Sequence, residues 1–91
     1  MISPNCDFKE FIQAIKDKDY TETIYLTDQE ATRAERSAFR SQSDPKKRQE
    51  FMEYSSVLKD FIKYFRCAVK PKLPEGDEYQ LFLSQRQNTN F

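Results

Sequence analysis

The stretch DPKKRQEFMEYSSVLKDFIKYFRCAV, from Asp44 to Val69, decides the fold of this 91-residue chain. Large apolar side chains recur along it at alternating steps of three and four residues, the spacing of one face of an α-helix. Asp44 suits the N-cap, and Pro45 suits the first helical position, where its missing N–H is not needed. We therefore predict a helix over residues 45–69 with an aromatic face that must be covered. That face comprises Phe51, Tyr54, Leu58, Phe61, Phe65 and Ala68.

Two amphipathic patterns precede the long helix. Residues 7–17 place Phe8, Phe11, Ile12 and Ile15 on one helical side, with Asp7 as the expected N-cap. Residues 20–41 carry a stripe of small side chains that lets this helix approach the aromatic face closely. A polar turn over residues 41–43 then predicts that the second and third helices form an antiparallel hairpin.

The structure of residues 20–26 is the main ambiguity of the sequence. This segment, YTETIYL, is rich in β-branched and aromatic residues, which favours a strand. Thr27 and Glu30 also match a capping box that would start a new helix at Asp28. We favour one helix over 20–41, because its apolar stripe runs unbroken from Ile24 to Ala38. The alternative is an α+β fold with a small strand pair, 20–26 with 79–83.

The end of the chain is predicted to be a short, loosely packed segment. Pro71 and Pro74 end the long helix. Residues 78–85 form a short helix or strand, and three of its apolar side chains can pack back on the bundle: Tyr79, Phe82 and Leu83. We expect residues 1–6 and 86–91 to fray. The prediction is one mainly α domain over residues 1–91, a three-helix antiparallel bundle with a long third helix.

Composition excludes several classes of function. The chain has no His, the commonest general base and the usual partner of a Ser or Cys nucleophile. A single Gly rules out a glycine-rich phosphate loop. Two isolated cysteines, Cys6 and Cys67, are too few for a zinc site. We therefore predict that the protein is not an enzyme and has no catalytic residues, cofactor or metal.

Hydropathy and the N-terminal residues predict the compartment. The mean hydropathy is −0.90, and no apolar run approaches the roughly 20 residues of a membrane span. The N-terminal residues have neither a basic start nor an apolar stretch typical of a signal peptide. We expect a soluble cytoplasmic protein without membrane contact, in which both cysteines are free thiols.

Charge is distributed unevenly along the chain. Residues 1–30 carry three Lys and seven Asp or Glu, whereas residues 31–72 carry eleven basic and five acidic residues. Such a basic segment can bind nucleic acid through phosphates. The zero net charge and the pI of about 6.3 argue against this function, because nucleic-acid-binding domains are usually strongly basic. A nucleic-acid-associated regulator is thus our alternative function. Its candidate phosphate contacts are Arg33, Arg36, Arg40, Lys46, Lys47 and Arg48.

Aromatic residues on the helices favour protein binding instead. A helix of about 11 residues spans about 16 Å and one of about 25 spans about 37 Å. The first helix therefore leaves part of the third uncovered, and we expect the C-terminal segment to be too polar to close it. We predict a non-catalytic interaction module, such as an adaptor, regulator or assembly factor, with a protein partner and a homodimeric state. The candidate interaction residues are Tyr25, Tyr54, Tyr64 and Phe65.

Overall fold

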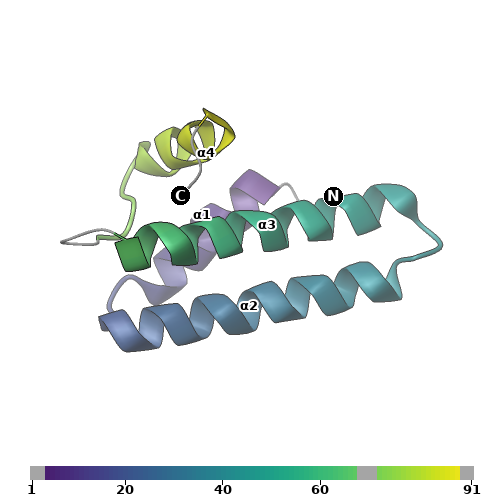
Figure 1. Ribbon diagram of the computed structural model, residues 1–91, viewed down its shortest axis with the longest axis horizontal. Coiled ribbons are helices and arrows are strands. Elements are labelled where there is room, and N and C mark those ends of the chain that lie inside the picture. The colour runs from purple at the N-terminus through teal and green to yellow at the C-terminus, as the bar shows by residue number, and fades with distance from the viewer. Residues whose placement is uncertain (1–3, 68–71, 89–91) are drawn as a thin grey trace.

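The computed structural model describes residues 4–67 and 72–88, which form four helices (Figure 1). These are α1 (Pro4–Ile15), α2 (Tyr20–Arg40), α3 (Pro45–Cys67) and α4 (Glu78–Asn88). The predicted mainly α fold is confirmed. No strand occurs in the described ranges, so the α+β alternative is wrong. The structure adds a fourth helix to the three predicted.

The bounds of α1 differ from the prediction at both ends. The helix begins at Pro4, so Asp7 lies within it rather than at its N-cap, and residues 4–6 are helical rather than frayed. Proline is favoured in a first turn. The helix ends at Ile15, whose carbonyl accepts a hydrogen bond from the Lys18 N–H at 3.0 Å. Asp19 then caps α2 by accepting from the Glu22 N–H at 2.7 Å, a role that the sequence analysis missed.

Residues 20–26 belong to α2, as we favoured. Thr23 and Thr27 are buried on the same side as Ala31, Ala34 and Ala38. The Thr27 hydroxyl donates to the Thr23 carbonyl at 2.6 Å, so Thr27 does not cap a new helix. The β propensity of this segment is therefore outweighed by its place on the small-residue stripe that packs against α3.

The predicted turn between α2 and α3 is confirmed. Ser41 is the C-cap of α2, and its N–H reaches the carbonyls of Ser37 and Ala38 at 3.1 Å each. Asp44 accepts a hydrogen bond from the Lys47 N–H at 3.3 Å, the geometry of an N-cap. The helix α3 extends to Cys67, and the predicted helical residues 68–69 lie outside the described residues.

An aromatic cluster holds α1 and α4 against α3. The ring of Phe61 lies 5.5 Å from that of Phe8 and 5.7 Å from that of Phe82, and Phe8 and Phe82 are 5.2 Å apart. Phe82 and Leu83 of α4 are each only 7% exposed. The C-terminal segment thus covers α3 at this end, and our expectation that it is too polar to do so is wrong. Leu58, Phe61 and Phe65 are buried as predicted.

Polar contacts complete the docking of α4. Arg86 donates from Nε to Asp60 and from Nη2 to the Ser56 hydroxyl, both at 2.8 Å. The ammonium of Lys9 on α1 lies 5.2 Å from the ring centroid of Tyr79. Residues 86–88 are therefore helical rather than frayed, while residues 89–91 lie outside the described part.

One buried hydroxyl offers a test of this packing. Thr23 Oγ1 has no hydrogen-bond partner among the described residues, whereas the equally buried Thr27 hydroxyl has one. Burying an unsatisfied hydroxyl costs about 1–3 kcal/mol. We expect Thr23→Val to raise the free energy of unfolding by about 1 kcal/mol in urea titrations. The matched control Thr27→Val should lower it slightly or leave it unchanged, and equal gains from both would contradict the assignment.

Candidate functional site

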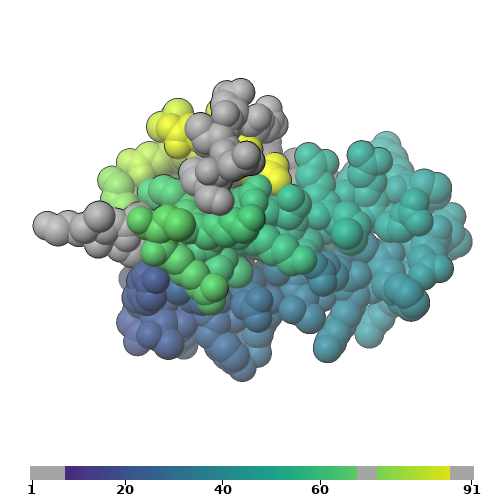
Figure 2. Space-filling view, viewed as in Figure 1, coloured from purple at the N-terminus to yellow at the C-terminus, as the bar shows by residue number. Residues whose placement is uncertain are grey.

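The α2–α3 hairpin is longer than the helices that cover it. With 23 residues, α3 spans about 34 Å, whereas α1, with 12, spans about 18 Å. Figure 1 shows the turn end of the hairpin projecting beyond both α1 and α4. We call residues 33–52 the hairpin arm. In Figure 2 only α2 and α3 form the surface of this arm on the side that faces the viewer.

One face of the hairpin arm exposes two large apolar side chains. Phe39 is 73% exposed and Met52 is 50% exposed. Phe39 lies one turn after Glu35, which accepts a hydrogen bond from Ser55 across the hairpin at 3.2 Å and pairs with Lys59. Met52 lies three residues before Ser55, on the same side of α3. Helical spacing therefore places Phe39 and Met52 on one face of the arm.

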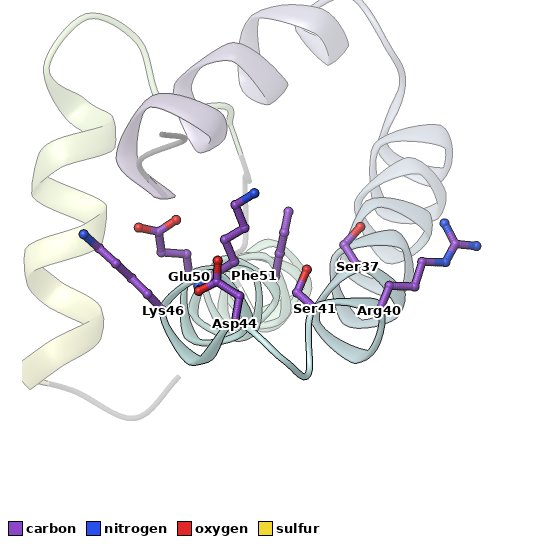
Figure 3. A pocket seen from close by; sticks show the side chains of 8 residues that line it. Ser37, Arg40, Ser41, Asp44, Lys46, Glu50 and Phe51 are labelled. Atoms are coloured by element: carbon purple, nitrogen blue, oxygen red, sulfur yellow. The ribbon is translucent and has the colours of Figure 1, made fainter.

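A groove of about 670 Å³ lies on the other side of the arm, between the ends of α2 and α3. Figure 3 shows Ser37 and Phe51 pointing from the two helices toward the side where α1 lies. Phe51 also lines a crevice of about 360 Å³ with residues of α1, so the groove continues the depression that α1 occupies. We call it the distal groove. Its lining residues are Ser37, Arg40, Ser41, Asp44, Lys46, Lys47, Glu50 and Phe51.

The predicted basic patch is brought together around the turn. Arg33, Arg36 and Arg40 line one shallow depression on α2, and Arg40 also lines the distal groove with Lys46 and Lys47. Arg33 is paired with Glu30. The five remaining cations are exposed and make no ion pair within residues 4–67 and 72–88. They are Arg36, Arg40, Lys46, Lys47 and Arg48.

The four predicted interaction residues do not share one surface. Tyr54 and Phe65 are buried in the core, where Tyr54 donates to Glu30 at 3.1 Å and Phe65 stacks on Tyr20. Tyr64 is half-buried against Phe61 and Phe82. Tyr25 is exposed, and its hydroxyl accepts from Gln29 at 2.7 Å. Of the four, only Tyr25 exposes most of its side chain to solvent.

Phe39 and Met52 were missed because the sequence analysis followed the apolar stripes. Both residues lie off those stripes, next to Ala38 and Phe51 respectively. An apolar side chain outside the stripe of an amphipathic helix is a signal that sequence alone contains. The distal groove has no such signal, since it depends on where α1 crosses the hairpin.

Glu30 links the arm to the covered part of the bundle. Its carboxylate accepts hydrogen bonds from Arg33 on the same helix and from Tyr54 on α3. The Arg33 hydrogen bond lowers the pKa of Glu30, against a smaller opposing effect of burial. The Lys59 hydrogen bond likewise lowers the pKa of Glu35 on the opposite side of the hairpin. Both carboxylates are stabilised in their charged forms.

The lowered pKa of Glu30 predicts acid sensitivity. A folded-state pKa below the unfolded value, about 4.3 for Glu, gives stability that is present above that pH and is lost as the pH falls through the folded pKa. The free energy of unfolding, measured by urea titration, should therefore decrease less between about pH 5 and pH 3 in Glu30→Gln than in the wild type. The control Glu53→Gln changes an exposed residue without an ion pair in the described ranges. An identical acid slope in wild type and Glu30→Gln would refute this assignment.

The described residues contain no group of three or more His, Cys, Asp or Glu placed to hold a metal. No helix within them is both long and apolar enough to cross a membrane. Cys67 is an exposed free thiol.

Comparison with known proteins found no matching family model, curated protein or solved structure. The function must therefore be argued from the hairpin arm itself.

Proposed function

We propose that the protein is a non-catalytic interaction module that binds other protein surfaces through its hairpin arm. The observation that carries this proposal is the exposure of Phe39 and Met52 on one face of the arm. Burying such a side chain stabilises a complex by about 1.5–3 kcal/mol, and aromatic residues are frequent at the energetic centres of interfaces. A role as a cytoplasmic adaptor, regulator or assembly factor is consistent with this arrangement.

Self-association through the same face is part of the proposal. We inferred a homodimer from the aromatic face of the third helix, but α1, α2 and α4 now bury most of that face. The hairpin arm still offers apolar surface. A two-fold axis through this face would pack Phe39 and Met52 of one chain against the same surface of a second chain, which is the usual geometry of small homodimers.

The homodimer is tested by size exclusion coupled to light scattering at micromolar concentration. Wild-type protein should have twice the 10.9 kDa mass of one chain. The double variant Phe39→Ser/Met52→Ser should have the mass of one chain, because it removes the apolar surface of the arm. Leu81→Ser is the control, since Leu81 is also exposed but lies on α4. A wild-type mass of one chain would exclude self-association.

A photo-crosslinking amino acid in place of Phe39 tests the module as a whole in the native cell. We expect crosslinks to a second copy or to another protein at position 39 and none at the control position 81. Crosslinks at neither position would refute the proposed function, whatever the mass in solution.

Nucleic-acid binding is the second candidate, favoured by the five exposed cations of the arm that make no ion pair with the described residues. It is opposed by Asp44 and Glu50, which line the distal groove among those cations and would repel phosphates. Under our proposal, retention on heparin is weak and depends little on salt. The triple variant Arg33→Gln/Arg36→Gln/Arg40→Gln should then leave any affinity for nucleic acid at background. A drop of about tenfold or more from a measurable affinity would favour this candidate.

A further inference from the structure

The helix α1 crosses the α2–α3 hairpin and packs mainly on α3 and α4. Phe8, Ile12 and Ile15 of α1 are buried in the hydrophobic core, at the i, i+4, i+7 spacing of a helix docked in a groove. Beyond Phe51, where residues of α1 end, α3 continues back to Pro45 for about 9 Å, or somewhat less than two helical turns. Within the described residues no helix occupies this distal part, and Phe51 extends the apolar floor into it.

The rim of the distal groove carries three exposed cations. Arg40, Lys46 and Lys47 line it and make no ion pair with any described residue. Of the two acidic residues in the lining, Asp44 is engaged as the N-cap of α3. Lys46 and Lys47 also lie at the positive end of the α3 dipole, in a first turn without an acidic residue, which disfavours the folded state. These charges complement an anionic partner.

We propose that the distal groove binds an acidic amphipathic helix of a partner protein. The apolar side chains of that helix pack on Phe51, beside the crevice that Phe51 shares with residues of α1. Its carboxylates face Arg40, Lys46 and Lys47. A helical peptide fits better than a nucleic acid, because Phe51 offers apolar contact that a row of phosphates cannot use.

This inference rests on the proposed function and names a partner for the second side of the arm. Phe39 and Met52 lie on the opposite face, so both surfaces can be occupied at once. The two assignments can therefore fail separately.

The first experiment uses a designed, fluorescein-labelled peptide of about 14 residues, long enough to form a helix on binding. It carries Leu at i, i+4, i+7 and i+11 and mainly Glu elsewhere. Fluorescence anisotropy measures its affinity, and amide chemical shifts map its site. We expect shift changes confined to residues 37–51. A scrambled peptide of the same composition, and a version with Lys in place of Glu, should bind at least about tenfold more weakly.

The second experiment separates binding from folding. Lys46→Glu/Lys47→Glu should lower the affinity for the acidic peptide by at least about tenfold. The same variant should raise the midpoint of unfolding in urea, because acidic residues suit the first turn of a helix. Lys16→Glu/Lys63→Glu makes the same change in net charge at exposed positions outside the arm and should keep the affinity. A loss of affinity in a more stable protein cannot come from unfolding.

Several outcomes would overturn the inference. Equal binding of the scrambled acidic peptide, or full competition by heparin, would show a general polyanion surface. Equal losses in the two double variants would show an effect of net charge alone. Shift changes outside residues 37–51 would place the site elsewhere. Peptide binding should survive Phe39→Ser/Met52→Ser. Crosslinking at position 39 without peptide binding would leave the proposed function standing and remove only the groove assignment.

Discussion

Phe61 is the contact on which three of the four helices depend. It is fully buried on α3 and meets Phe8 of α1 and Phe82 of α4 through ring pairs at 5.5 and 5.7 Å. Edge-on and tilted pairs at such distances are favourable beyond the area that they bury. Because Phe8, Phe61 and Phe82 contact one another, the aromatic part of the core lies at one end of the hairpin. Two short helices are held there, and the contacts of Arg86 with Asp60 and of Lys9 with Tyr79 reinforce their docking.

That concentration explains why the other end of the hairpin is open. The small residues Ala34 and Ala38 bring α2 close to α3. A pair of packed helices leaves the side chains on both sides of its contact line exposed unless a further element covers them. With α1 ending its coverage near Phe51, one side remains a groove, and the opposite side exposes Phe39 and Met52. The hairpin arm is therefore a consequence of helix lengths.

Local signals predicted the parts of the fold that local interactions determine. We could predict three features because each depends on residues close together in the sequence. They are the helical spacing of the apolar residues in α3, the N-cap at Asp44 and the turn that begins at Ser41. The start of α1 was misplaced because Pro4 and Asp7 both suit the first turn of a helix. The role of α4 was misjudged for a different reason. Its helix has no clear apolar face, and burial of Phe82 depends on a space formed by Phe8 and Phe61, far away in the sequence.

The candidate site divides in the same way. The basic patch was predictable, because Arg33, Arg36 and Arg40 follow helical spacing and a short turn brings Lys46 and Lys47 beside them. The distal groove was not, since its shape depends on the crossing of α1 over the hairpin. Tyr54 shows that residue type alone does not identify a binding residue. It was a candidate for binding, yet its ring fills the core and its hydroxyl donates to Glu30.

The zero net charge of the chain does not determine the charge of the ligands that the hairpin arm can bind. A basic segment can simply neutralise an acidic one within a fold, but among the described ion pairs only Arg33–Glu30 joins the two segments. Lys18 pairs with Glu22 and Arg33 with Glu30, both within one turn of helix. Charges separated by more than about 8–10 Å are largely screened at physiological salt, and the molecule is 42 Å long. The turn end therefore acts as a local cationic surface. What separates a protein partner from a polyanion is the arrangement within the groove, where Asp44 and Glu50 alternate with the cations beside an apolar floor.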